Sequence, residues 1–208
     1  ANKYISQDEL EKYSNESINT FLHKEKNRFS SDYYLEVIRQ KIIDTFGEEY
    51  LYGGGLSVRT SLDTEAQFQA DNALKDGLLV YDKRYGYRGV IKNDSSDNWL
   101  KNIENTVLPY NFDFAKVISV GDNSAFIETS LNDKGEIKLS NLTWAREHIR
   151  GGYVGPKIES VHDVLNENDI IYISIDSGGD YNLEQIPDIN GGIVVMDPHS
   201  GRVVALSG

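Results

Sequence analysis

The sequence predicts an α+β fold in which a small antiparallel β domain is inserted between a helix-and-strand segment and a C-terminal β-hairpin. Three observations lead to this prediction. Apolar residues recur at helical spacing in residues 31–88, short β-rich runs alternate with turn residues in 89–189, and two apolar runs flank a turn in 190–208. Residues 1–30 are expected to form a helical linker. We therefore divide the 208-residue chain into these four parts.

Two helices are expected before residue 50. Ser6 and Glu9 have capping-box spacing, in which the hydroxyl and the carboxylate accept hydrogen bonds from free N–H groups of a first turn, so a short helix is predicted over residues 6–14. The stretch SSDYYLEVIRQKIIDTFG predicts a longer amphipathic helix that ends at Gly47. Its apolar stripe comprises Tyr34, Ile38, Ile42 and Phe46, with Leu35 and Val37 beside it.

A strand, a turn and a helix are expected in the stretch GGGLSVRTSLDTEAQFQADNALKDGL. Leu56, Val58 and Thr60 alternate with other residues in the pattern of a strand, and Asp63 is placed to cap the following helix. Small side chains on that helix predict a closely packed neighbour. This small-residue stripe comprises Ala66, Ala70 and Ala73, with Leu74 beside them.

Short β-rich runs then follow one another, separated by turn residues, and predict a small barrel or sandwich. The runs are FAKVISV, SAFIETS, EIKLS, IIYISI and YNLEQI. Residues 149–161 lack either periodicity and are expected to form a long loop.

The last residues predict a β-hairpin, with runs 193–196 and 203–206 joined by a turn that contains Asp197, Pro198 and Gly201. Both runs are apolar at nearly every position, which is typical of strands covered on both faces. Uncovered apolar faces and open strand edges favour association. We therefore expect the hairpin to pack on residues 31–80 or to pair with a second copy of the chain.

Composition excludes several classes of function. The chain holds 33 acidic and 21 basic residues, a formal charge of −12, which disfavours nucleic-acid binding because phosphates are repelled. The absence of cysteine excludes thiolate catalysis and disulfides. No apolar stretch approaches the roughly 20 residues that span a bilayer, and the first residues lack the order of a signal peptide. Any export signal or anchor is expected outside these residues.

No cofactor or metal site is predicted. The four histidines have no ligand-like spacing, and the glycine-rich stretches match neither a dinucleotide fingerprint nor a P-loop. Asp176 and Asp180 flank a turn without the further oxygen ligands of an EF-hand loop.

The stretch YDKRYGYRG interleaves three tyrosines with three cations in an otherwise acidic chain. One interpretation is a stacking platform for sugars or bases, with Tyr81, Tyr85, Tyr87 and Arg88 as candidate interface or glycan contacts. The other is a packed seam between domains, in which the arginines pair with neighbouring carboxylates. Sequence alone leaves both open.

Five ordered motifs together resemble the region between the two catalytic domains of class A penicillin-binding proteins, closest to Gram-negative members of the 1A type. They are GGLSVRTSLDTEAQFQADNALKDGL, YDKRYGYRG, LTWAR, YNLEQIP and GGIVVMDPHSGRVVALSG. Thr64 departs from the proline that the family often has there, and either residue suits a first helical turn. The signature residues of these motifs, expected to be structural, are Asp63, Gly86, Gly89, Trp144, Ala145, Arg146, Pro187, Asp197, Pro198 and Gly201.

The resemblance implies that the β domain is an OB-like small barrel and that the terminal hairpin is the first hairpin of the transpeptidase domain. It implies a parent protein with peptidoglycan glycosyltransferase and serine-type D-Ala-D-Ala transpeptidase activities, acting in cell-wall biogenesis and cell shape at the periplasmic face of the inner membrane. Expected partners are those two domains, nearby peptidoglycan and an outer-membrane lipoprotein activator.

No catalytic residue is predicted in these 208 residues. A penicillin-reactive site needs Ser-x-x-Lys and Lys-Thr-Gly, and the sequence contains neither. Ser96-Asp97-Asn98 spells Ser-x-Asn alone, in a polar stretch, and is read as a chance match. The role expected for the region is to position the two catalytic domains and to offer a docking surface for regulators. The rival is a stand-alone OB-type module that binds oligosaccharide or single-stranded nucleic acid.

Overall fold

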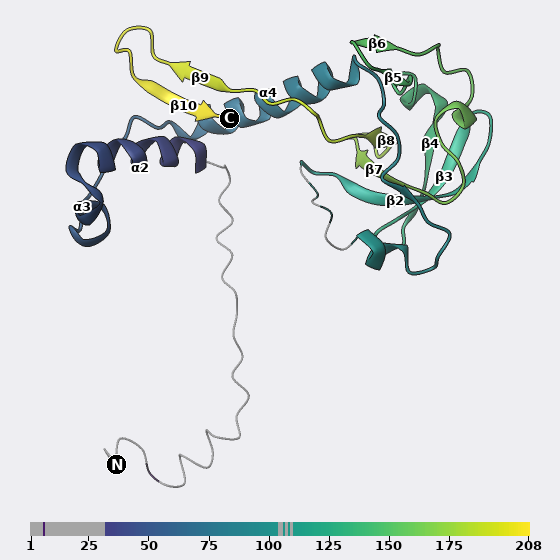
Figure 1. The fold of residues 1–208 in the computed structure, drawn as a ribbon, viewed down its shortest axis with the longest axis horizontal. Helices are drawn as coiled ribbons and strands as arrows, with labels where there is room; N and C mark the ends of the chain where they lie inside the picture. The colour runs from purple at the N-terminus through teal and green to yellow at the C-terminus, as the bar shows by residue number, and fades with distance from the viewer. Residues whose placement is uncertain (1–5, 7–31, 104–105, 107, 109) are drawn as a thin grey trace.

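The computed structural model describes residues 6, 32–103, 106, 108 and 110–208. These residues form two parts, which Figure 1 shows joined through one long helix. The arm consists of the helices α2 (Asp32–Phe46), α3 (Glu48–Gly53) and α4 (Thr64–Lys83) with the hairpin of β9 (Ile193–Met196) and β10 (Val203–Ser207). The β domain holds the strands between α4 and β9. The helix predicted over residues 6–14 lies outside the described residues, apart from Ser6.

The helix α2 (Asp32–Phe46) confirms the first amphipathic prediction, and Gly47 after it has a φ of 86°, as its position beyond the helix end requires. A short helix, α3 (Glu48–Gly53), follows directly. Only Tyr34 of the predicted stripe is fully buried, and Phe46 is exposed, because α2 contacts the rest of the arm mainly near its first turns.

The strand predicted around Leu56 and Val58 is wrong, since residues 55–63 form an irregular segment in which both side chains are exposed. No described strand lies beside this segment to pair with it along its length. The helix α4 (Thr64–Lys83) is confirmed with its cap, because Asp63 Oδ1 accepts hydrogen bonds from the N–H groups of Glu65 and Ala66, both 3.0 Å long.

The buried face of α4 differs from the predicted alanine stripe. Ala70 is buried, but Ala73 is exposed, and the polar side chains of Gln67 and Asp71 occupy the covered face. Gln67 is there because its amide hydrogen-bonds to the backbone of β10, as described below.

The five predicted strands of the β domain are all present in one antiparallel sheet with the order β1-β7-β2-β3-β4, and β8 pairs with β7. Three short 3₁₀ helices, η1 (Trp99–Ile103), η2 (Leu139–Asn141) and η3 (Val161–Asp163), connect them. The predicted loop 149–161 contains part of a small hairpin of β5 and β6. The strands are β1 (Lys92–Asn93), β2 (Asp113–Val120), β3 (Ser124–Thr129), β4 (Lys134–Lys138), β5 (His148–Ile149), β6 (Tyr153–Val154), β7 (Asp169–Ile175) and β8 (Tyr181–Glu184).

The main core of the β domain lies inside the curled sheet and includes Val117, Ile127, Ile137, Ile171 and Leu183. The sheet does not close into the predicted barrel within the described residues, because β4 and β8 share no backbone pairing there.

Side chains bridge β4 and the start of β8 instead. The ring of Tyr181 lies against Gly135, where an added Cβ would be 2.2 Å from the ring, and Lys138 Nζ is 2.9 Å from Asp180 Oδ1. The inserted ring occupies the space next to the backbone of β4, so the gap between the two strands is filled by side-chain packing.

The terminal hairpin is confirmed as β9 (Ile193–Met196) and β10 (Val203–Ser207). It packs on residues 31–80, as predicted, and the contact is mainly with α4. Ala205 is buried, and an added Cβ at Gly191 would lie 3.2 Å from Leu74 and Leu78. The expectation that both faces are covered is met on one face only, since Val194 and Met196 are 56% and 54% exposed.

Candidate functional site

The buried carboxylate of Asp82, in the last turn of α4, joins the arm to the β domain. Its two oxygens accept hydrogen bonds from Nη1 and Nη2 of Arg88, each 2.9 Å long. Oδ2 also accepts a hydrogen bond from Gln185 Nε2 at 2.8 Å, and Oδ1 accepts one from the N–H of Asp188 at 3.1 Å. Asp82 therefore binds the chain where it enters the β domain and again where it leaves.

A hydrogen bond between Gln185 and Arg88 completes this junction. Gln185 Oε1 accepts from the N–H of Arg88 at 3.1 Å, while Gln185 Nε2 also donates to the carbonyl of Gly86 at 2.9 Å. The Arg88 guanidinium donates in addition to the carbonyl of Ile186. The buried side chains of Asp82 and Gln185 have all their polar atoms partnered, which is what a buried polar network needs in order to be rigid.

A second ion pair lies beside the first. Lys83 Nζ is 2.7 Å from Glu184 Oε2 and sits 4.8 Å from the centre of the Trp144 ring. Ser174 Oγ donates to Glu184 Oε1 at 2.8 Å, which fixes the carboxylate on the sheet. The end of α4 is thus held at two places.

The turn between α4 and the β domain depends on Gly86. Its φ is 85°, and an added Cβ would lie 2.5 Å from the carbonyl oxygen of Arg146. This close approach lets the N–H of Tyr87 donate to that carbonyl at 2.7 Å, and the N–H of His148 donates to the carbonyl of Tyr87 at 3.0 Å.

The four residues proposed as a stacking platform fall into two groups. The ring of Tyr87 is buried edge-on against Trp144, and its burial, with the nearby charge of Asp169, raises its pKa above the ordinary range. Arg88 is engaged by Asp82, as the seam interpretation expects. Tyr81 and Tyr85 face outward, with their hydroxyls 2.9 Å apart, and this hydrogen bond raises the pKa of Tyr85.

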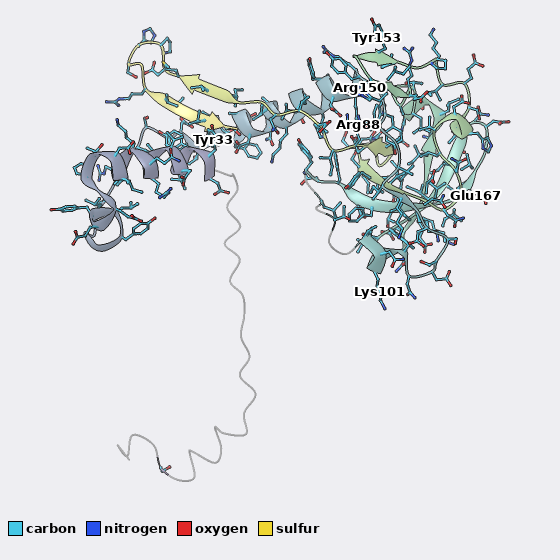
Figure 2. All side chains as sticks on the ribbon, in the orientation of Figure 1. Tyr33, Arg88, Lys101, Arg150, Tyr153 and Glu167 are labelled. Carbon is cyan, nitrogen blue, oxygen red and sulfur yellow. The ribbon has the colours of Figure 1, made fainter. Side chains whose placement is uncertain are left out.

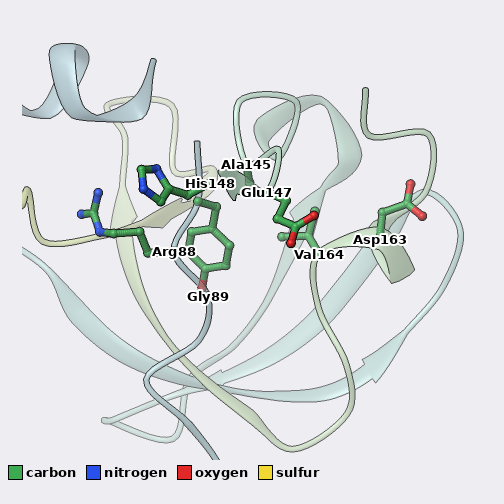
Figure 3. Close-up of a pocket in the computed structure, with 8 residues that line it drawn as sticks. Arg88, Gly89, Ala145, Glu147, His148, Asp163 and Val164 are labelled. Carbon is green, nitrogen blue, oxygen red and sulfur yellow. The ribbon is translucent and has the colours of Figure 1, made fainter. Parts of the chain in front are cut away.

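A hollow of about 390 Å³ opens beside the buried Tyr87, and Figure 3 shows the side chains that line it. Arg88 and His148 lie at one end, and the carboxylates of Glu147 and Asp163 lie toward the other. Two backbone N–H groups, those of Glu159 and Ser160, donate to Asp163 Oδ2 and lower the pKa of that carboxyl. Asp163 is therefore committed to holding a turn.

Comparison with known proteins decides what this architecture is. Residues 87–189 match the family model described as the penicillin-binding protein OB-like domain. Penicillin-binding protein 1A of Rickettsia typhi is 34% identical over 99% of this chain, and that of Escherichia coli is 30% identical over 99%. Residues 87–189 belong to the family of penicillin-binding protein OB-like domains. The chain spans 25% of the length of both relatives.

A crystal structure of penicillin-binding protein 1A from Haemophilus influenzae has the same fold, with a TM-score of 0.68 and 28% identity. The match covers 99% of this chain and 29% of that one. The similarity to penicillin-binding protein 1A therefore includes the arm as well as the OB-like domain.

The signature residues of the penicillin-binding protein 1A resemblance lie at turns and seams. Trp144 and Ala145 pack against Tyr87 or in the core, and Arg146 Nε donates to the carbonyl of Gly155 at 2.7 Å. The hairpin turn is closed by a hydrogen bond from the N–H of Gly201 to the carbonyl of Asp197, 2.8 Å long. Asp63 caps α4, and Gly86 and Gly89 have positive φ. Pro198 lies in the hairpin turn, and Pro187 follows the end of β8.

Sequence reasoning missed Asp82, Gln185 and Gln67 as the central polar residues of this chain. Neither glutamine carried a clear signal, because polar residues ordinarily border the apolar stripe of an amphipathic helix and Gln185 lies on a short β run. In the described part of the chain, no three metal-binding side chains converge and no helix is long and apolar enough to span a bilayer.

Proposed function

We propose that this region positions the glycan-polymerising and peptide-crosslinking domains of a bifunctional peptidoglycan synthase, on the periplasmic side of the inner membrane. The observation that carries the proposal is the Asp82 junction, which hydrogen-bonds to both passages of the chain between the arm and the OB-like domain. A fully partnered buried network of this kind resists bending, which is what a spacer between two enzymes requires.

The arm supplies the connection to the crosslinking domain in this proposal. Val194 and Met196 leave an apolar face of β9 exposed, and strands that are apolar on both faces belong inside a larger sheet assembly. The hairpin is therefore the first hairpin of the transpeptidase domain, whose nucleophile belongs to another part of the protein.

The OB-like domain supplies a docking surface for a regulator, and an outer-membrane lipoprotein activator is the proposed partner. The outer face of the sheet offers Ile118 and Phe126, which are exposed side chains on the paired strands β2 and β3. Exposed apolar side chains surrounded by polar residues are typical of protein interfaces. The acidic chain would steer a basic partner toward this face.

The similarity of the arm favours this role over a stand-alone OB-type module. Relatives match over 99% of the chain, which includes the helices and the hairpin that a free OB module does not need. An independent acyl-transferring enzyme would need a Ser-x-x-Lys motif, which these residues lack.

Two experiments test the proposal. In the full-length synthase, Asp82→Ala should uncouple crosslinking from polymerisation, lowering the crosslinked fraction of newly made glycan several-fold while polymerisation continues. The matched control is Asp76→Asn, on the exposed side of α4. An equal crosslinked fraction of newly made glycan in both variants would contradict the positioning role.

The second experiment incubates the 208-residue chain with a fluorescent penicillin. No covalent adduct is expected, because the serine nucleophile is assigned elsewhere. A labelled band that is lost on boiling with hydroxylamine would show an acyl-serine and overturn the assignment.

A further inference from the structure

Two stretches far apart in the sequence form the basic region of this acidic protein. Residues 81–88 and 146–157 together hold six lysines and arginines against two carboxylates, although the chain as a whole carries −12. They lie side by side, because Tyr87 forms a parallel β-bridge with Glu147, and Nδ1 of His148 is 2.7 Å from the carbonyl oxygen of Tyr85. Lys83 and Arg88 are paired with Glu184 and Asp82, so the positive charge left at this place on the junction comes from the other four cations.

Two exposed tyrosines, Tyr81 and Tyr153, and the half-buried Tyr85 lie in the same region. Tyr81 and Tyr85 form a ring pair with centres 5.1 Å apart, and Tyr153, at the start of β6, is 72% exposed. Each glycine of the β5–β6 turn lies next to one of these rings. An added Cβ at Gly152 would lie 3.6 Å from the Tyr85 ring, and one at Gly151 would lie 3.7 Å from the Tyr153 ring.

Two arginines of this region are free to meet a ligand. Arg88 is bound to Asp82 and Arg146 to the carbonyl of Gly155, whereas Arg84 and Arg150 are exposed and form no ion pair within the described residues. Figure 2 shows Arg150 and Tyr153 on the same side of the OB-like domain, near Arg88. Aromatic faces and unpaired guanidinium groups thus lie within one surface.

We infer that this surface, defined by Tyr81, Arg84, Tyr85, Arg150 and Tyr153, binds an oligosaccharide that bears carboxylates. Tyrosine rings stack on the apolar faces of sugar rings, and guanidinium groups pair with carboxylates in planar, directional hydrogen bonds. A polyphosphate chain would meet the repulsion of the whole acidic molecule. The inference rests on the proposed function and extends it, since an uncrosslinked glycan strand bears carboxylates on its peptides, or on its muramic-acid residues where the peptide is absent.

The assignment changes the platform expected from the sequence. Tyr87 is not part of the surface because it is buried, and Arg88 is not part of it because it is paired with Asp82. Arg84, Arg150 and Tyr153 enter it, and the last two come from a turn more than sixty residues further along the chain. The glycine pair in that turn gives the backbone the positive φ values that a tight return requires.

The test is a titration of the isotope-labelled 208-residue chain with a tetrasaccharide of alternating N-acetylglucosamine and N-acetylmuramic acid, followed by NMR. Saturable shifts are expected at residues 81–85 and 148–154. Chitotetraose, which lacks carboxylates, should bind at least fivefold more weakly. Anionic phospholipid vesicles form a separate arm, and binding to them with no shift by the tetrasaccharide would overturn the inference in favour of a membrane surface.

Variants locate the site. Tyr153→Ala and Arg150→Ala should each weaken binding at least fivefold, and both positions lie on an exposed turn, so the fold is expected to stay intact. The matched controls are Tyr52→Ala on α3 and Lys101→Ala at the far end of the OB-like domain, which should change affinity less than twofold. Equal effects of site and control variants would refute the site. This outcome is separate from the coupling experiment, which measures the junction and needs no glycan affinity here.

Discussion

Gln67 on α4 and Leu206 on β10 are joined by two hydrogen bonds that run in opposite directions. Gln67 Oε1 accepts from the N–H of Leu206 at 2.9 Å, and Gln67 Nε2 donates to the carbonyl of Leu206 at 3.0 Å. A neighbouring strand would offer the same pair of bonds. The side-chain amide therefore takes the place of a strand at the outer edge of the hairpin, and the N–H of Asp63 adds a bond to the carbonyl of Val204.

Replacing this amide tests how the hairpin is held on the arm. Gln67→Leu leaves the two backbone groups of Leu206 and the buried carboxylate of Asp71 without this partner, so the arm should lose about 2–4 kcal/mol of unfolding free energy. Amide hydrogen exchange at Leu206 should accelerate in parallel. Gln69→Leu, an exposed position that bonds only Glu65 in its own helix, should cost less than about 0.5 kcal/mol. Equal exchange rates in the two variants would refute the edge-strand role.

Gly86 tests the turn into the OB-like domain. Alanine there combines a positive φ with a Cβ 2.5 Å from the Arg146 carbonyl, so Gly86→Ala should cost about 2–4 kcal/mol in urea unfolding. Gly77→Ala is the same chemical change within α4, where an added Cβ meets nothing within 4 Å, and should stabilise by about 1 kcal/mol. A loss of unfolding free energy in both variants would indicate disruption of the helix and would contradict a specific role of the turn at Gly86.

Gly135 tests the contact between β4 and the start of β8. An added methyl group would lie 2.2 Å from the Tyr181 ring, so Gly135→Ala should displace that ring and cost about 1–3 kcal/mol. Changed NMR shifts of the Tyr181 ring and faster exchange along β4 would report the displacement. The comparison is Gly121→Ala, whose Cβ would lie at an ordinary 3.5 Å from Ser124 O and should leave both observables near the wild-type values.

Asp163 gives a pH dependence with a definite sign. Its folded pKa is lowered below the ordinary value of 3.8 by the N–H groups of Glu159 and Ser160, so its contribution to folding stability is complete above pH 3.8 and is lost as pH falls through the lowered pKa. The amide shifts of both residues should titrate together with the Asp163 carboxyl, with a midpoint below 3.8. A midpoint at or above that value would contradict the hydrogen bonds, and Asp163→Asn should abolish the titration.

The strands of the OB-like domain could be predicted from the sequence because each is a compact β-rich run bounded by turn residues, as in β2 before Gly121. The order of those strands could not, since β7 pairs with β2 across half of the domain. Local alternation also failed around Leu56, where no neighbouring strand is available to convert the pattern into pairing.

The candidate site was harder to predict than the strands. The stretch YDKRYGYRG indicated a special region, but whether Tyr87 stacks on a ligand or packs in a seam depends on Trp144, which is distant in sequence. Tyr153 carried no local signal, because it joins the surface only through the fold of the β5–β6 turn.

The chain enters and leaves the OB-like domain at Asp82, so this domain is an insertion with its two ends close together. Its two attachment points lie against the same carboxylate, so the arm does not depend on the inserted domain to span any gap between Lys83 and Asp188. A short glycine-serine tether in place of the whole domain is compatible with an intact arm, and lineages are free to exchange, enlarge or discard such an insertion without rebuilding the enzyme around it.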